Sequence, residues 1–175
     1  MIESISKKLA HSLKAAIPDH PFSEAKLTFG IHLLLNTVLT IGSAVVLGAL
    51  SGRLADTMIS LFAFALLRAV SGGYHFKSAL ICVIVSSATA AALPFIPLSD
   101  AAIIGINILN ILLILIYAPS RIDGQTRIPK RHYPKLKIIS LVIASTNFLF
   151  ASPLLALTWL VQSISLIRLK GGESK

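Results

Sequence analysis

One short stretch of the sequence combines a thiol, an imidazole, a guanidinium and a pair of glycines. Cys82 is the only cysteine of the chain, and His75 lies seven residues before it. A histidine can take the proton of a cysteine thiol, and the thiolate can then attack a carbonyl carbon. Because no second cysteine exists for a disulfide, Cys82 is either a buried thiol or a reactive one. The stretch therefore predicts a Cys82–His75 dyad, with Arg68, Gly72 and Gly73 beside it.

The spacing of the two residues sets a condition on this dyad. In one continuous helix, seven residues rise about 10.5 Å, beyond the hydrogen-bond reach of about 3 Å. His75 must therefore lie in a loop that folds back onto a helix beginning near Lys77 or Ser78, and the glycine pair gives that loop its freedom. Cys82 would lie one turn inside the helix, where free N–H groups and the helix dipole favour a thiolate. The alternative is an inert packing thiol beside an interfacial His75.

The elements that must position these residues are apolar helices. The chain is 55% hydrophobic and only 13% charged, with a mean hydropathy of +0.82, whereas a soluble domain carries about a quarter charged residues. This composition excludes a soluble globular enzyme, a disordered chain and a disulfide-stapled domain. Since about 20 apolar residues cross a bilayer, the sequence predicts an all-α, polytopic integral membrane bundle of about six helices. The expected spans are residues 28–50, 55–70, 78–98 and 101–118, and a run, 138–167, that Ser152 and Pro153 divide into two short helices.

The basic residues predict the orientation of the bundle. The chain has 16 Lys and Arg against 7 Asp and Glu. With the N-terminus in the cytoplasm, all of the Lys and Arg residues except Arg53 fall on the inner side, which favours an even number of spans in the cell membrane and two cytoplasmic termini. Nucleic-acid binding is not expected, because the basic residues separate apolar runs instead of gathering on one soluble face.

The first 27 residues are expected to form an amphipathic helix. Apolar side chains recur there at helical spacing among lysines, and these charges argue against a cleavable signal peptide. The helix either lies on the inner membrane surface or packs on the bundle. We expect one membrane domain over residues 1–175, in which residues 1–27 are interfacial, 28–169 form the bundle and 170–175 form a cytoplasmic tail.

A basic loop follows the fourth expected span. It includes Arg127, Lys130 and Arg131, and it could bind an acidic part of a substrate or anionic lipid head groups, or could only set the topology. Arg68 is expected either to orient a substrate carbonyl and its oxyanion or to anchor its helix at the interface. The sequence lacks the GxxxxGK[ST], GxGxxG, CxxC and HExxH motifs, so no cofactor and no metal are expected.

The pattern RxxxGGxHxxxxxxC, formed by Arg68, the glycine pair, His75 and Cys82, resembles the accessory gene regulator B (AgrB) family. These proteins are membrane endopeptidases of Gram-positive peptide signalling. A second similar element is the Tyr-Ala-Pro sequence at Tyr117, although the loop that follows keeps the family pattern only loosely. The resemblance covers most of the chain.

The resemblance implies a thiol protease of quorum sensing. It implies that Cys82 cleaves a small amphipathic, AgrD-like propeptide with His75 as the general base. It further implies an acyl-enzyme that a side chain of the peptide can attack, closing a thiolactone or lactone ring. Arg68, Gly72, Gly73 and Lys77 would then have supporting roles.

Two other classes of protein compete with this interpretation. A non-catalytic transporter of peptide or lipid would need a polar path along several spans, but the spans hold only scattered Asn, Ser and Thr. A catalytically inactive membrane scaffold would keep its function in the Cys82→Ala variant. Membrane lipid is an expected partner in every case, and the small size of the bundle is compatible with a homodimer.

Overall fold

Every regular element of the described residues is helical. The computed structural model describes residues 2–18, 21–74, 76, 78–122 and 129–167. Along the chain the elements are α1 (Ile2–Ala16), α2 (Glu24–Leu50), α3 (Leu54–Ser71), α4 (Ala79–Ala92), the 3₁₀ turn η1 (Leu93–Phe95), α5 (Asp100–Tyr117), the 3₁₀ turn η2 (Lys130–His132), α6 (Tyr133–Ser145), α7 (Asn147–Phe150) and α8 (Pro153–Ser165). The prediction of an all-α fold is confirmed for these residues.

Three helices, α2, α3 and α5, are long and apolar enough to cross a membrane, judged by length and composition. The shorter apolar helices Ala79–Phe95 and α8 lie where further spans were expected. These features agree with a helical membrane protein. The number of spans and their direction remain predictions.

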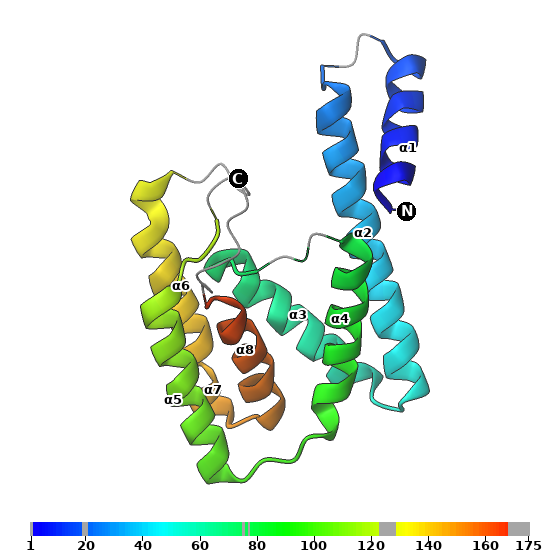
Figure 1. Ribbon diagram of the computed structural model, residues 1–175. Coiled ribbons are helices and arrows are strands. Elements are labelled where there is room, and N and C mark those ends of the chain that lie inside the picture. Colours follow the sequence, from blue (N-terminus) through cyan, green and yellow to red (C-terminus); the bar gives the residue numbers. More distant parts are fainter. Residues whose placement is uncertain (1, 19–20, 75, 77, 123–128, 168–175) are drawn as a thin grey trace.

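Helix α3 occupies the centre of the fold. It runs obliquely between α2 and α4 on one side and α5, α6 and α8 on the other (Figure 1). One apolar cluster joins α3 to α5, α6 and α8 and contains Leu67, Ile114, Ala118, Ala144, Trp159 and Leu166. A smaller cluster joins α3 to α2 and α4 and contains Ala44, Leu61 and Ala90. Both halves of the bundle are therefore held by burial of apolar side chains against the same helix.

The N-terminal helix packs against the first half of α2 (Figure 1). Ile2 and Ala10 are buried in this contact, while Leu9 and Leu13 remain exposed. Of the two placements considered for this helix, the structure shows packing on another helix. The exposed apolar side chains are suited to contact with lipid.

The long apolar run near the C-terminus turns where the sequence predicted. Helix α7 ends at Phe150, and α8 begins at Pro153 with Ser152 as its N-cap. The side chain of Asn147 holds this turn: its Nδ2 donates to the carbonyl oxygen of Ser152 at 3.0 Å, and its Oδ1 accepts from the N–H of Ser152 at 3.0 Å. Nδ2 also donates to Oδ1 of Asn107 on α5 at 3.0 Å, so the turn is fixed to the neighbouring helix.

Candidate active site

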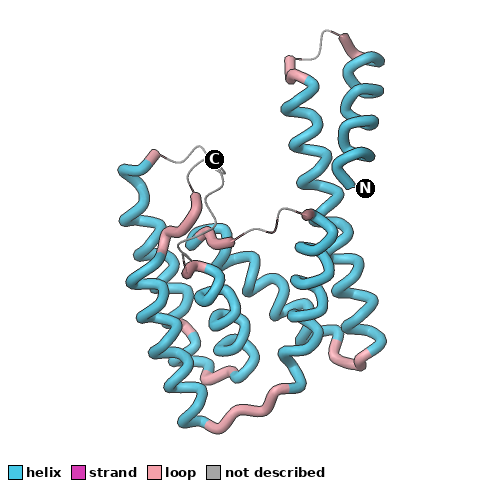
Figure 2. The backbone as a smooth tube through the Cα atoms, viewed as in Figure 1, coloured by secondary structure: helices cyan, strands magenta, loops and turns pink. Residues whose placement is uncertain are grey.

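Cys82 lies in the first turn of α4, as expected from the sequence. Helix α3 ends at Ser71 and α4 begins at Ala79, and the connection between them is drawn as a loop and an undescribed trace (Figure 2). Ser78 caps α4, and the N–H of Cys82 donates to the Ser78 carbonyl oxygen at 3.1 Å. The two helices are thus not one continuous helix. His75, Lys77 and Arg127, which complete the predicted set, lie outside the described residues, so the distance from His75 to Cys82 remains a prediction.

The glycine pair closes α3 in conformations that few other residues adopt. Gly72 has φ 72° and Gly73 has φ 130°, both in the region that favours glycine. Gly72 forms a parallel bridge with Ser120. The N–H of Ser120 donates to the carbonyl oxygen of Ser71 at 2.9 Å, and the N–H of Gly73 donates to the carbonyl oxygen of Ser120 at 2.9 Å. A Cβ atom on Gly72 would lie 2.2 Å from the Ser120 oxygen. The two elements that carry the family resemblance therefore lie side by side.

Arg68 and Gln162 fasten this turn to α8. Arg68 donates from Nη1 to Oε1 of Gln162 at 3.3 Å and from Nη2 to the carbonyl oxygen of Tyr74. Gln162 donates from Nε2 to Oγ of Ser71 at 2.9 Å and to the carbonyl oxygen of Gly72 at 2.6 Å. Side chains of α3 and α8 thereby hold the backbone on which the loop toward Cys82 begins.

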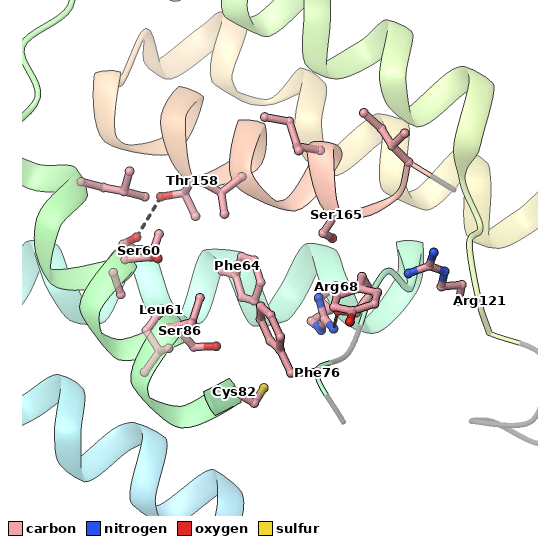
Figure 3. A pocket seen from close by; sticks show the side chains of 18 residues that line it. Ser60, Leu61, Phe64, Arg68, Phe76, Cys82, Ser86, Arg121, Thr158 and Ser165 are labelled. Atoms are coloured by element: carbon pink, nitrogen blue, oxygen red, sulfur yellow. Dashed lines mark hydrogen bonds between the residues drawn. The ribbon is translucent and has the colours of Figure 1, made fainter. Parts of the chain in front are cut away.

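A cavity of about 600 Å³ opens between α3, α4 and α8. Figure 3 shows Arg68 and Arg121 toward one end and the hydrogen-bonded pair Ser60 and Thr158, 2.9 Å apart, toward the other. Cys82 contributes to the wall from α4. Most of the lining is apolar, and its aliphatic and aromatic members are Leu61, Phe64, Tyr74, Phe76, Val85, Ala90, Leu93, Val161, Ile164 and Ile167.

The charge at the cavity is positive. Arg68 lies over the ring of Phe64 at 5.5 Å, and Arg121 lies over the ring of Tyr74 at 4.9 Å. Arg68 and Cys82 both line this cavity. None of the described lining residues carries a carboxylate. Two cations and no carboxylate on the described wall make this cavity suited to an anionic group.

The predicted residues separate into two places in the described structure. Arg68, from the last turn of α3, and Cys82, from the first turn of α4, line the cavity, and Gly72 and Gly73 directly follow α3. Lys130 and Arg131 lie in η2 before α6, are exposed, and do not line the cavity. No group of three metal-ligating side chains occurs among the residues that the structure describes.

Gln162, Ser165 and Arg121 are parts of the site that the sequence analysis did not single out. Gln162 is the one primary amide in residues 153–167, and an amide at that depth is a signal for a buried polar contact. Ser165 donates to Oε1 of Gln162 at 3.2 Å, and the N–H of Tyr74 donates to its carbonyl oxygen at 2.9 Å. Arg121 belonged to the predicted basic loop but was not distinguished within it.

The fold and the site together define a helical membrane protein with a largely apolar cavity. The thiol of Cys82 and the guanidinium groups of Arg68 and Arg121 line this cavity. The family model for AgrB, accessory gene regulator B, matches residues 2–169. The chain therefore belongs to the AgrB family.

Individual relatives are distant. AgrB-like protein 2 of Clostridium perfringens strain 13 is 30% identical over 84 residues, which cover 48% of this chain and 39% of that protein. An AgrB-like protein of Halalkalibacterium halodurans is 29% identical over 120 residues, which cover 68% of this chain and 61% of that protein. The chain thus spans about 39% to 61% of the length of these relatives. No solved structure matches the chain.

Proposed function

We propose that this protein is a membrane-embedded cysteine endopeptidase that cleaves a small amphipathic, AgrD-like propeptide at the cytoplasmic face. The observation that supports this most directly is the position of Cys82, which borders the cavity together with Arg68. Both residues belong to the segment that carries the family pattern. A cysteine that served only in packing would not require a cavity or a neighbouring cation.

The reaction begins with proton transfer from the Cys82 thiol to His75. The sulfur attacks the carbonyl carbon of the scissile amide, and the oxyanion that forms returns to a carbonyl as the C–N bond breaks. The protonated His75 delivers its proton to the leaving amine, and the N-terminal part of the peptide stays on Cys82 as a thioester. Water can hydrolyse this thioester. A thiol or hydroxyl of the bound peptide can instead displace Cys82 and close a thiolactone or lactone, with the proton returning through His75 to the thiolate.

Arg68 supports this chemistry by charge. Its guanidinium has five N–H donors, and the contacts to Gln162 and Tyr74 use donors of only its two terminal nitrogens. The remaining donors are available to a carbonyl or oxyanion beside Cys82. The apolar wall of the cavity is suited to apolar side chains of the peptide, and Arg121 is suited to a carboxylate of the peptide.

The membrane arrangement belongs to the same proposal. In it, α2 to α8 supply about six crossings, both termini lie in the cytoplasm, and the start of α4 faces the cytoplasm with Cys82. An amphipathic substrate held on the inner leaflet would reach the cavity by diffusion in two dimensions, which favours encounter. The exposed apolar side chains of α1 and α2 support contact of this region with lipid.

The decisive experiment measures both the thiol and the peptide. Alkylation of Cys82 by iodoacetamide is followed against pH for the purified wild-type protein and for His75→Ala, and cleavage of a tagged AgrD-like propeptide is followed in cells. We expect Cys82→Ser, Cys82→Ala and His75→Ala to abolish cleavage while the proteins still insert. We also expect His75→Ala to slow alkylation near neutral pH. Cleavage that persists in Cys82→Ala would contradict the proposal and favour the transporter or scaffold.

A further inference from the structure

We propose that Gln162 is a positioning residue of the candidate site, whose amide fixes Arg68 and the Gly72 backbone in place beside the cavity that Cys82 lines. This inference rests on the proposed function and adds to it a residue of α8, from the far end of the chain. The structure gives Gln162 no place on the cavity wall, so it acts through the groups that it holds.

The burial of Gln162 shows that its contacts matter. Its exposed fraction is 0%, and it lies in the second half of α8. An amide loses its hydrogen bonds to water on burial, and this loss is costly unless the protein replaces them. In this case both amide hydrogens and the amide oxygen have partners in the protein.

The partners come from both sides of the amide. Nε2 uses its two N–H groups on Oγ of Ser71 and on the carbonyl oxygen of Gly72, at 2.9 and 2.6 Å. Oε1 accepts from Nη1 of Arg68 at 3.3 Å. Oγ of Ser165 lies 3.2 Å from the same oxygen and donates its one hydrogen at shorter range to the Gln162 carbonyl oxygen, at 2.7 Å. A primary amide has two donor hydrogens, so both donors of Gln162 are used and its oxygen holds Arg68.

These contacts extend from Gln162 to the loop beyond α3. Arg68 is held by Gln162 at one terminal nitrogen and reaches the carbonyl oxygen of Tyr74 with the other. A Cβ atom on Gly73 would lie 3.3 Å from Nε2 of Gln162 and 3.4 Å from Nη1 of Arg68, so the loop is packed closely on the pair. The position of the Arg68 cation on the cavity wall that Cys82 also lines consequently depends on the amide.

Only an amide can make this set of contacts. Leucine has a similar shape but replaces none of the hydrogen bonds to Arg68, Ser71 and Gly72. Glutamate keeps the acceptor for Arg68 and loses both donors, which would leave the carbonyl oxygen of Gly72 facing a carboxylate. The requirement is therefore for a side chain that donates toward the turn and accepts from the cation.

The test is a double-mutant cycle read by alkylation of Cys82 with iodoacetamide. The full chain in detergent is compared as wild type, Gln162→Leu, Arg68→Gln and the double variant between pH 6 and pH 10. The matched control is Asn110→Leu, because Asn110 is buried, donates to the carbonyl oxygen of Ala156 on α8 at 3.1 Å, and lies away from the cavity wall. Among the described residues, the other titratable or charged groups on that wall are Tyr74 and Arg121.

We expect Gln162→Leu to move the alkylation profile to higher pH and to slow alkylation near pH 7 about tenfold, because an anchored cation favours the thiolate. The double variant should be no slower than Arg68→Gln, since Gln162 acts through Arg68. Asn110→Leu should keep the wild-type profile while showing a similar loss of thermal stability. If Gln162→Leu does not insert, Gln162→Asn, whose amide is too short to reach both sides, should give the same shift.

Two results would overturn the inference: a wild-type profile in the Gln162 variants, or effects of Arg68→Gln and Gln162→Leu that multiply. Failure of the proposed function would be recognised separately. In that case the wild-type protein would cleave no AgrD-like propeptide, whereas the alkylation cycle would still report whether Gln162 fixes Arg68.

Discussion

At the scale of single residues, the site depends on a glycine, because one position beside it has no room for a Cβ atom. Gly73 has φ 130°, and a Cβ atom there would lie 2.6 Å from Oγ of Ser165. Gly105 on α5 has nothing within 4 Å of the same position. The backbone at Gly73 therefore requires glycine, whereas the position of Gly105 has room for a methyl group.

We predict that Gly73→Ala destabilises the protein by about 1–3 kcal/mol through backbone strain, with a further cost from the contact with Ser165. Alkylation of Cys82 should change in the same variant, because the turn lies next to Arg68. Thermal unfolding in detergent measures the first effect and iodoacetamide labelling the second. Gly105→Ala is the control, and it should be neutral or stabilising by up to about 1 kcal/mol. Equal behaviour of the two variants would contradict the argument.

At the scale of helices, the sequence predicted those features that local patterns determine. The long apolar runs identified α2 and α5, and the Ser152–Pro153 pair located the start of α8, because proline fits the first turn of a helix but not its interior. The seven-residue spacing of His75 and Cys82 excluded a single helix through both, and α4 does begin only at Ala79.

The sequence could not predict the contacts that join distant segments. Gln162 lies far along the chain from Arg68, and hydrophobic periodicity carries no information about which polar groups will meet. The bridge between Gly72 and Ser120 likewise depends on how α3 and α5 end beside each other. The motif predicts Cys82, Arg68 and the glycines of the candidate site. The contacts of Gln162 and Ser120, which hold that segment in place, follow only from tertiary packing.

The turn between α7 and α8 gives a prediction about helix pairing. Asn147 is fully buried and makes three hydrogen bonds, two to the backbone of Ser152 and one to Asn107. Asn147→Leu should destabilise the protein by about 2–4 kcal/mol, because the buried Asn107 oxygen and the half-buried N–H of Ser152 would lose their partners. Thr37→Val is the control, since Thr37 is exposed and bonds only within its own helix. Unfolding in mixed micelles would show the difference, and a loss no larger than that of Thr37→Val would refute the role of Asn147.

At the scale of the whole molecule, the short helices limit the thickness of the bilayer that the protein can span. Helix α8 has 13 residues, about 20 Å at 1.5 Å per residue, against about 30 Å for a typical hydrocarbon core. We predict that the protein is more stable in bilayers of short acyl chains, because thinning the bilayer around short helices costs free energy. Thermal unfolding in vesicles of 14-carbon and 22-carbon phosphatidylcholine measures this. A protein that is as stable or more stable in the thicker bilayer would show that these helices do not span it.

The orientation of the bundle gives the last prediction, and the single cysteine makes it accessible to experiment. In a Cys82→Ala background, Arg53→Cys marks the turn between α2 and α3, and Lys135→Cys marks the start of α6. Figure 1 places these two regions at opposite ends of the bundle. Arg53 is exposed and pairs with Asp56 at 3.2 Å, and an exposed pair of this kind contributes about 0–1 kcal/mol, so its loss should leave the fold intact.

We expect a membrane-impermeant maleimide to label Arg53→Cys on intact cells and to label Lys135→Cys only after the membrane is opened. The reason is that every other Lys and Arg lies on the side assigned to the cytoplasm, and moving such charges across the bilayer is unfavourable. The opposite pattern would invert the molecule and place the start of α4, with Cys82, outside the cell. A propeptide on the inner leaflet could then no longer reach the thiol, so this measurement decides whether the proposed peptidase meets its substrate on the side where that substrate is made.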